Sequence, residues 1–321
     1  MRILFLGGTR FTGSALAKLL SDAKHQVSIA SRRMPPSNMK VETILGEREE
    51  LLVKLKDREF DIVFDFIAYK DKDVHSALDA ISARRYVLVS TTWLPCFLGL
   101  LNAGEEIQDI HFERLEGIPQ ITQKYLMGKA SAEIAVTKYF AEGRDVSIIR
   151  FPVVMGRDDH TKRLHFYRSR LKDGNGLIVD DVIGREIQVV TNIDLARAMK
   201  KWTENFHEAP QLIWDALPPK RLLWVDFLKS LAEADGSNAV LIPVPLVQLR
   251  REFPEYLELD PLWREKSIQL SKFNLFEYSS LDTSPLKQWM GNLEAIQVTD
   301  LSKEMRAKEL VFIKKMIAKD N

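Results

Sequence analysis

Residues 3–20 read ILFLGGTRFTGSALAKLL, an apolar run followed by a glycine-rich turn and a segment with helical spacing. The run ILFLG is too short for a helix and is typical of a buried strand, whereas Leu16, Leu19 and Leu20 recur on one helix face. A strand, a glycine turn and a helix N-terminus together offer backbone N–H groups and a partial positive charge to a phosphate. The stretch is therefore a candidate cradle for a dinucleotide pyrophosphate, and a tight turn without a ligand is the alternative.

The rest of the first 150 residues continues this alternation. Further apolar strands are predicted at HQVSIAS, VETILG, DIVFDFIA, RRYVLVS and DVSIIRF, and helices at EREELLVKL, KDVHSALDAI and TQKYLMGKASAEIAVTKYFAE. Continuous apolar strands between amphipathic helices indicate a parallel sheet that is covered on both faces. With right-handed crossovers, this pattern predicts an α/β fold with a Rossmann-like, doubly wound parallel sheet.

The alternation ends after Pro152. One more strand and helix, in IQVVTNIDLARAMKKW, are expected to return to the sheet, whereas the remaining segments are richer in Pro, Trp and charge. We therefore assign residues 1–156 and about 186–207 to a dinucleotide-binding domain. Residues 157–185 and 208–321 are assigned to a smaller mixed lobe that would bind the substrate.

The composition restricts the classes of partner. The 321 residues include 46 Lys and Arg against 45 Asp and Glu, which gives no reason to expect nucleic acid or an anionic membrane as an obligate partner. Cys96 is the single cysteine, so no intrachain disulfide can form and no metal centre is expected. No window approaches 18 apolar residues and the N-terminal run lacks a signal-peptide pattern, so we expect a soluble cytoplasmic protein.

The end of the second predicted strand bears on the choice of cofactor. An acidic residue there would bind the ribose hydroxyls of NAD, but the chain reads SRR, with Ser31 in that place and Arg32 next. A guanidinium can fork onto a 2′-phosphate, so NADP is favoured over NAD, and a solvated basic turn is the alternative. In the glycine turn, Gly7 and Gly13 fit the first and last positions of the usual spacing, and Arg10 occupies the middle one.

The helix predicted after the fifth strand carries Tyr125 and Lys129 at positions i and i+4, on one face. An ammonium beside a phenol lowers the phenol pKa and makes it a usable general acid or base for a carbinol or carbonyl oxygen. A Ser or Thr hydroxyl at the end of the fifth strand could hold that oxygen, and Lys129 could also bond the nicotinamide ribose. The carboxyl ends of the strands share one crevice, so these groups are expected to meet the glycine turn. A half-buried tyrosine with a solvated lysine is the alternative.

Taken together, these motifs resemble the short-chain dehydrogenase/reductase superfamily, in its extended branch of sugar-nucleotide epimerases and dehydratases. The resemblance spans about residues 1–200, in GGTRFTG, LGERE, DIVFDFIAYK, RYVLVSTT, YLMGK, IIRFPVVMGRDD and VTNIDLARA. The C-terminal third matches more loosely, in SSLDTSPLKQWMG. It implies that Thr91 is the catalytic hydroxyl, with Thr92 as a one-residue alternative, and that Tyr125 is the acid/base with Lys129 as its partner. At the pyrophosphate, it implies contacts with Gly7, Gly8, Thr9, Arg10, Phe11, Thr12 and Gly13. Along the rest of the cofactor, it implies Glu47 and Arg48 at the adenine, Phe66, Ile67 and Ala68 as lining, Lys70 at the phosphate or ribose, and Pro152 to Val154 at the nicotinamide. Ser31 and Arg32, at the end of the second strand, are the further candidate cofactor residues given above.

Three features depart from that family's pattern. Arg10 replaces a glycine, and the connection between Ala68 and Arg85 is short and lacks an asparagine near the active site. Thr92 and Trp93 stand where dehydratases of the family carry an Asp-Glu pair, which argues against a 4,6-dehydratase. The spelling GGTRF resembles the chloroplast stem-loop-binding proteins, which are RNA-associated relatives of the epimerases, and their bacterial homologues.

Two further segments are candidates for binding. The most basic window, residues 157–174, could contact a nucleotide diphosphate or RNA, or form a solvated helix face. The apolar residues 93–104 could form a lid or a homodimer surface, or a buried core segment. The leading hypothesis is an NAD(P)-dependent epimerase or reductase that acts on a nucleotide-sugar-like substrate by hydride transfer. The alternatives are a non-catalytic nucleotide-sensing or RNA-associated protein that retains the fold, and a reductase of a small carbonyl compound.

Overall fold

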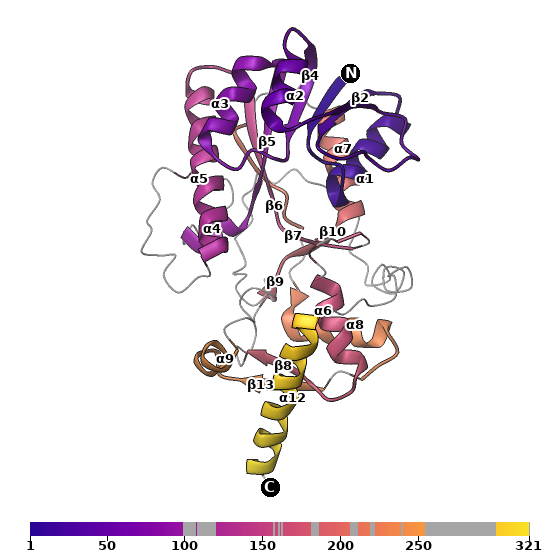
Figure 1. Cartoon of the computed structure of the whole chain (residues 1–321), viewed down its shortest axis with the longest axis vertical. Helices are drawn as coiled ribbons and strands as arrows, with labels where there is room; N and C mark the ends of the chain where they lie inside the picture. Colours follow the sequence, from indigo (N-terminus) through magenta and orange to yellow (C-terminus); the bar gives the residue numbers. More distant parts are fainter. Residues whose placement is uncertain are drawn as a thin grey trace. The chain divides into compact units, whose positions relative to one another are not determined.

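The computed structural model describes residues 1–98, 107, 120–156, 158–159, 161, 163–180, 186–205, 211–218, 222–238, 240–253 and 300–320. The chain divides into two compact units (Figure 1). Unit 1 comprises Met1–Val154, Val189–Pro219 and Ser267–Ser279. Unit 2 comprises Met155–Gln188, Lys220–Lys266 and Ser280–Asn321.

Unit 1 is built on a seven-stranded sheet with the strand order β11-β6-β5-β4-β1-β2-β3. Every neighbouring pair in it is parallel, and β1 lies between β2 and β4. This order, in which the chain runs outward from the centre in both directions, confirms the predicted doubly wound α/β fold. The strands are β1 (Arg2–Leu6), β2 (Gln26–Ser31), β3 (Glu42–Leu45), β4 (Glu59–Asp65), β5 (Ser82–Thr91), β6 (Val146–Phe151) and β11 (Ile213–Asp215).

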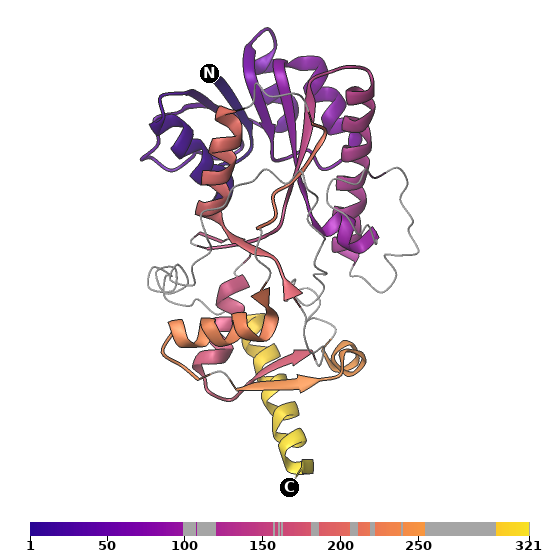
Figure 2. The same ribbon diagram turned by 180° about the vertical axis from the view of Figure 1, so that it is seen from behind.

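Helices cover both faces of this sheet (Figures 1 and 2). Ile3 and Phe5 of β1 belong to the core under α1 and α7, whereas Leu4 and Leu6 belong to the core under α2, α3 and α5. Successive side chains of a strand point to opposite faces, so a strand that is buried on both sides must be apolar throughout, as ILFL is. The helices are α1 (Phe11–Asp22), α2 (Arg48–Leu55), α3 (Asp71–Ala80), α4 (Trp93–Leu98), α5 (Gln120–Ala141) and α7 (Asn192–Glu204).

The structure differs from the sequence prediction at the strand that follows β6 in the sheet. β10 (Val189–Thr191) pairs with β7 (Val153–Met155) and does not join the large sheet, although α7 after it does cover the sheet. The edge position belongs to β11, from a segment that was assigned to the smaller lobe. A strand of three residues carries no readable alternation. Its place is fixed by tertiary packing, since Trp214 contacts Trp202 of α7 with ring centroids 5.8 Å apart.

Unit 2 contains short strands and four described helices. β13 pairs with β8 in parallel and β12 pairs with β9 in antiparallel fashion. No helix within the described residues is long and apolar enough to span a membrane. The elements are α6 (Arg163–Lys172), β8 (Leu177–Asp180), β9 (Glu186–Ile187), β12 (Leu222–Leu223), α8 (Trp224–Ala234), β13 (Leu241–Val244), α9 (Leu246–Glu252) and α12 (Asp300–Asp320).

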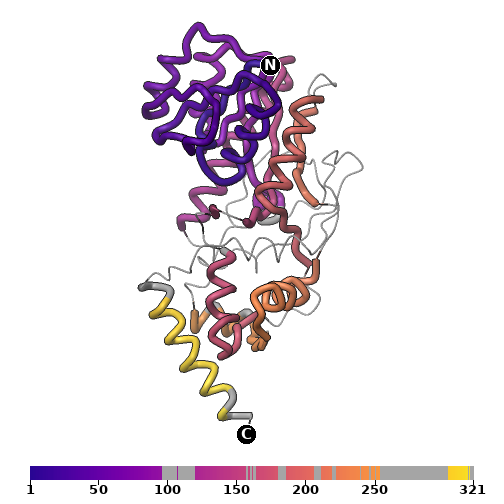
Figure 3. The backbone as a smooth tube through the Cα atoms, turned by 90° about the vertical axis from the view of Figure 1, so that its right-hand side faces the viewer, coloured from indigo at the N-terminus to yellow at the C-terminus, as the bar shows by residue number. Residues whose placement is uncertain are grey.

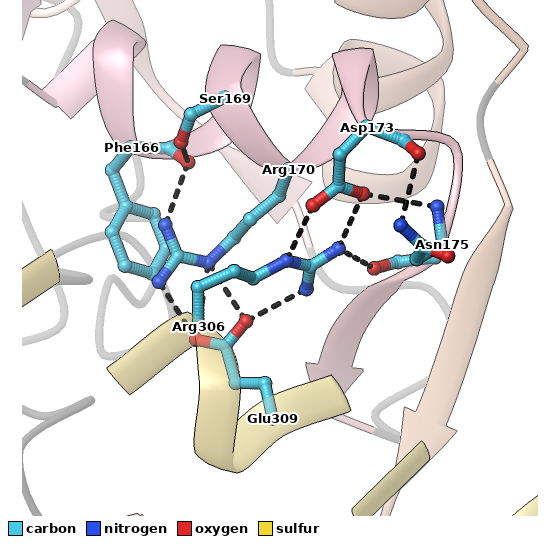
Figure 4. Close-up of polar contacts among 8 residues, drawn as sticks. Phe166, Ser169, Arg170, Asp173, Asn175, Arg306 and Glu309 are labelled. Atoms are coloured by element: carbon cyan, nitrogen blue, oxygen red, sulfur yellow. Dashed lines mark hydrogen bonds and ion pairs between the residues drawn. The ribbon is translucent and has the colours of Figure 1, made fainter. Parts of the chain in front are cut away.

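Helices α6 and α12 run side by side in unit 2 and are joined by a buried ion pair (Figures 3 and 4). Arg170 Nη2 donates to Glu309 Oε1 at 2.7 Å, and neither side chain is more than 1% exposed. The Arg170 guanidinium also lies 3.6 Å from the ring centroid of Phe166. Arg306 forks onto Asp173 and reaches Glu309 as well, so two arginines anchor α12 to α6.

Candidate active site

The turn after β1 requires its glycines. Gly7 and Gly8 have φ values of 81° and 74°, in the left-handed region where side chains are disfavoured. A Cβ atom on Gly13 would lie 2.5 Å from the Gly8 Cα atom, so α1 can approach the turn only with glycine at this place. The three glycines therefore have the backbone roles that a phosphate-binding turn assigns to them.

Arg10 fits the turn without strain of its own. It precedes α1 with φ −132° and ψ 157°, an extended conformation that any residue adopts, and its side chain is exposed. No side chain caps the start of α1, and Thr12 is buried with a hydroxyl that has no hydrogen-bond partner among the described residues. An uncapped helix N-terminus and a buried orphan hydroxyl fit a bound pyrophosphate. Phe11 has φ 51°, a strained value for a bulky residue, and its ring packs on the core.

At the end of β2, the Ser31 hydroxyl is hydrogen-bonded, whereas the Arg32 side chain is largely exposed. The Ser31 hydroxyl donates to the Arg33 carbonyl at 2.6 Å, which holds it within its own turn. The Arg32 side chain is 70% exposed, with its nearest carboxylate, Glu47, at 3.9 Å. Glu47 and Glu50 form a capping box at the start of α2, so the Glu47 carboxylate also has a structural role.

Arg48 points inward and anchors the segment after β4. Its guanidinium donates to both carboxylate oxygens of Asp65, at 3.1 Å and 2.7 Å, and to the Asp73 carbonyl at 2.7 Å. Asp65 is fully buried and also accepts hydrogen bonds from the Tyr86 hydroxyl at 2.9 Å and the Ile67 N–H at 3.0 Å. The contacts of Arg48 are thus those of a support for the chain between β4 and α3.

Residues 66–68 join the glycine turn to α5. A Cβ atom on Gly7 would lie 2.6 Å from the Cγ2 atom of Ile67, and Phe66 stacks on Phe5 beneath the turn with ring centroids 5.8 Å apart. The carbonyl of Ala68 accepts a hydrogen bond from Lys129 Nζ at 2.9 Å. The predicted cofactor residues of this segment therefore lie between the glycine turn and Lys129. Lys70 follows as the exposed residue before α3.

Lys129 is buried at the end of the sheet. Its side chain is 3% exposed, and Nζ donates to the Ala68 carbonyl and, at 2.8 Å, to the Val89 carbonyl of β5. Burial lowers the pKa of Lys129 to about 8, and the Asp65 and Glu133 carboxylates act in the opposite direction. The alternative that Lys129 is solvated is therefore wrong.

Tyr125 lies four residues before Lys129 on α5 and is partly buried beside Leu94 and Leu126. Its ring centroid is 6.3 Å from that of Tyr69, which sequence reasoning did not single out. The signal that was available is Gly128, because an isolated glycine inside a helical pattern indicates a close backbone approach. A Cβ atom on Gly128 would lie 2.1 Å from the Tyr69 carbonyl oxygen.

The hydroxyls at the end of β5 differ in their partners. Thr91 Oγ1 accepts a hydrogen bond from the Trp93 N–H at 3.2 Å, at the start of α4. Thr92 is fully buried, and its Oγ1 atom has no partner among the described residues; the same holds for Ser90. An unsatisfied buried hydroxyl is costly, so Thr92 and Ser90 are the hydroxyls with unused hydrogen-bonding capacity.

Behind the site, α5 is tied to β6 by a buried ion pair. Arg150 Nη2 donates to Glu133 Oε2 at 2.7 Å, and Asp215 of β11 lies 3.7 Å from Arg150 Nη1. The motifs of the sequence do not indicate this pair, because its partners come from separate elements. Val153 and Val154, predicted beside the nicotinamide, are buried in β7 directly after Pro152.

Several predicted features belong to unit 2 or lie outside the described residues. In the basic window, Arg168 and Lys172 both pair with Asp235, and Arg170 pairs with Glu309, so these charges serve the packing of unit 2. The apolar segment 93–104 is described only as far as α4, and the rest of it lies outside the described residues. The loosely matching motif SSLDTSPLKQWMG lies outside them entirely.

No protein-family model matches the sequence, and no curated protein is significantly similar to it. Solved structures, however, share its fold over almost the whole length. An NAD-dependent NDP-hexosamine 5,6-dehydratase of tunicamycin biosynthesis is 15% identical with a TM-score of 0.64, over 92% of this chain and 99% of its own. UDP-glucose 4-epimerase of Thermus thermophilus, solved with NAD, is 16% identical with a TM-score of 0.59, over 91% and 98%.

A variant UDP-glucuronic acid 4-epimerase of Bacillus cereus was solved with UDP-4-deoxy-4-fluoro-glucuronic acid and NAD. It is 16% identical with a TM-score of 0.59, over 98% of this chain and 100% of its own. The chain therefore has the fold of the NAD-dependent sugar-nucleotide epimerases and dehydratases, and the resemblance carried by its motifs is confirmed at the level of the fold.

Proposed function

We propose that the protein is an NAD(P)-dependent oxidoreductase or epimerase that moves a hydride between nicotinamide C4 and a carbinol carbon of a nucleotide-sugar-like substrate. The observation that carries this proposal is the segment 66–68. It packs on Gly7 at one end and accepts the hydrogen bond of Lys129 at the other. The glycine turn and the Tyr125–Lys129 pair are thereby parts of one continuous, packed site in unit 1.

The fold supports the proposal. Structures that share it include NAD-dependent or NAD-bound enzymes of sugar nucleotides, and one structure was solved with UDP-glucose and NAD. Fold alone does not fix function, since one fold hosts many reactions. The added support is that this chain keeps a glycine turn, orphan hydroxyls and a buried lysine at the same end of its sheet.

The residues present fit a dinucleotide. The N–H groups at the uncapped start of α1 would hold the pyrophosphate, with the exposed Arg10 beside it. Arg32 would take the 2′-phosphate of NADP, because its side chain is 70% exposed and no carboxylate occupies the position of Ser31. NADP is thus preferred to NAD. The cofactor supplies a hydride acceptor and donor at nicotinamide C4.

The protein's own groups would handle the proton. The Tyr125 phenolate would take the proton from the substrate carbinol, and in the reverse direction the phenol would return it to the carbonyl oxygen, as the hydride moves. The Thr91 hydroxyl would donate to the same oxygen, with the orphan hydroxyl of Thr92 as the neighbouring alternative. In its protonated form, Lys129 would favour the phenolate of Tyr125.

A Tyr125→Phe variant tests this role. It is expected to bind NADP as the wild type does but to lose about 10²- to 10⁴-fold in kcat, which is the usual contribution of general acid–base catalysis. Turnover is followed by nicotinamide absorbance with a panel of nucleotide sugars. Tyr139→Phe is the matched control, because Tyr139 lies on the same helix and its hydroxyl contacts His75 at 2.8 Å, away from the site. Unchanged kcat in Tyr125→Phe would contradict the mechanism.

A further inference from the structure

Tyr69 stands over the buried lysine of the proposed site. Its ring centroid is 4.8 Å from Lys129 Nζ and 6.3 Å from the ring centroid of Tyr125. Tyr69 is 50% exposed, whereas Lys129 is 3% exposed. An exposed aromatic ring thus covers an ammonium that water does not reach.

The hydrogen bonds of Lys129 indicate which of its protonation states the Tyr69 ring favours. An ammonium has three N–H groups, and two of them donate to the carbonyls of Ala68 and Val89. The neutral amine still has two N–H groups, so both hydrogen bonds survive deprotonation. The third N–H group carries the proton that is lost on titration. Besides the two carbonyls, the Tyr69 ring is the group of the described residues that lies against Nζ. The face of an aromatic ring attracts a cation and so favours the protonated form.

The backbone on both sides of this ring is fixed. The Tyr69 N–H donates to Asp73 Oδ2 at 2.8 Å, at the start of α3. Its carbonyl oxygen packs so closely on α5 that only glycine fits at position 128. Tyr69 is therefore held in place by two helices, although half of its surface is exposed.

We propose that Tyr69 is a positioning residue of the reaction centre, whose ring covers the Lys129 ammonium and keeps water from it, one turn of α5 away from Tyr125. Its part in turnover rests on the proposed function. Its part as a cover for Lys129 is a property of the chain alone and can be measured without substrate or cofactor.

The charges around Lys129 set the direction of the expected effect. Burial is the largest cause and lowers its pKa to about 8. Asp65 of β4, Glu133 of α5 and Asp73 of α3 favour the charged form, and Arg48 of α2 disfavours it. Removing the cover admits water and relieves the largest cause, so the pKa of Lys129 must then rise toward its ordinary value of 10.5.

Competitive acetylation with mass-spectrometric readout tests the cover on the full-length protein. The acetylation rate of Lys129 is measured against pH, with Lys138, an exposed residue of the same helix, as the internal standard. In the wild type we expect slow modification with a midpoint near the pKa of about 8. Tyr69→Ala should raise the alkaline plateau rate and move the midpoint up by about one unit or more. Tyr69→Phe keeps the ring and should leave both quantities unchanged.

Tyr69→Leu separates the two parts of the proposal. It keeps apolar bulk over Nζ but removes the aromatic face, so the plateau rate should stay low while the midpoint falls. The far-ultraviolet circular dichroism of each variant shows whether it is folded. Unchanged plateau and midpoint in folded Tyr69→Ala would overturn the proposal, as would a Tyr69→Phe variant that behaves like Tyr69→Ala.

The pH dependence of kcat then links the cover to the reaction. With a nucleotide sugar that turns over, Tyr69→Ala should shift the pH profile and Tyr69→Phe should not. If the acetylation results are as expected but the wild type turns over no nucleotide sugar, the cover stands and the proposed function fails. If the wild type is active but acetylation of Lys129 is indifferent to Tyr69, the proposed function stands and this inference fails.

Discussion

Burying a lysine in a folded protein costs free energy for its charged form, and neighbouring hydrogen-bond acceptors offset only part of this cost. Lys129 shows both sides of this balance. It is nearly inaccessible, two backbone carbonyls accept its N–H groups, and its pKa is lowered to about 8. The same residue therefore ties α5 to β5 and to the segment after β4, and it keeps a group that titrates close to neutral pH.

The lowered pKa of Lys129 makes stability depend on pH. Between about 8 and the ordinary value of 10.5, the unfolded chain binds more protons at this position than the folded chain, so stability rises with pH. We expect the unfolding free energy of the wild type, relative to Lys129→Met, to rise by about 3 kcal/mol across this window, at about 1.36 kcal/mol per pKa unit. Urea unfolding at several pH values measures it. Lys138→Met, at an exposed position, should show no such slope, and a flat difference for Lys129→Met would contradict the burial.

The sequence predicts which residues are candidates for the site better than it predicts how deeply they are buried. The i and i+4 spacing places Tyr125 and Lys129 on one helix face, but spacing carries no information about which carbonyls that face meets. For the same reason Tyr69 could not be found, because its contact with Lys129 is made between separate elements. Gly128 was the one local sign of that contact.

At the scale of elements, the position of α5 is fixed by its close contacts with the segment after β4 and with β5. Gly128 brings the helix onto the Tyr69 carbonyl, Lys129 binds two strand ends, and the Ser131 hydroxyl accepts the Asp71 N–H at 3.1 Å. These contacts hold the segment after β4 between the glycine turn and α5. A change in that packing should therefore reach both the cofactor side and the Tyr125 side of the proposed site.

A Gly128→Ala substitution tests the close approach. Alanine ordinarily stabilises a helix by about 1 kcal/mol over glycine. At position 128 we expect the opposite sign, because the new Cβ atom would lie 2.1 Å from a backbone oxygen that cannot move cheaply. The matched control compares Lys138→Gly with Lys138→Ala at an exposed position of the same helix, where alanine should be the more stable. Chemical denaturation gives both differences, and a stabilised Gly128→Ala variant would refute the packing.

In unit 2, α12 depends on its buried ion pair with α6 (Figure 4). Glu309→Gln leaves Arg170 buried without its countercharge and should cost about 3–5 kcal/mol. The double variant Arg170→Met with Glu309→Met should recover most of that loss, because apolar replacements of a buried pair are often neutral or stabilising. Arg251→Ala breaks an exposed pair with Glu252 and should cost at most about 1 kcal/mol. Equal losses for the buried and the exposed pair, measured by thermal unfolding, would argue against this anchor.

For the whole molecule, the fold was predictable from the sequence where strands are long and apolar. The strands β1, β2, β4, β5 and β6 each present a continuous apolar run, and the helices between them are amphipathic. β11 could not be predicted, because its three residues gain their place from Trp202 and from pairing with β6. The sequence of unit 2 has no regular hydrophobic periodicity from which its elements could be predicted. Its packing relies on the Arg170–Glu309 pair.

The central claim is that the glycine turn of unit 1 binds a dinucleotide, and calorimetric titration with NADP and NAD tests it most directly. We predict one NADP per chain, with tighter binding than NAD. Arg32→Ala should weaken NADP binding by about 10- to 100-fold, as expected for loss of a charge-assisted hydrogen bond, and leave NAD unchanged. Gly13→Ala, whose Cβ atom would collide with Gly8, should abolish both. The absence of binding by either dinucleotide to the folded wild-type protein would contradict the claim.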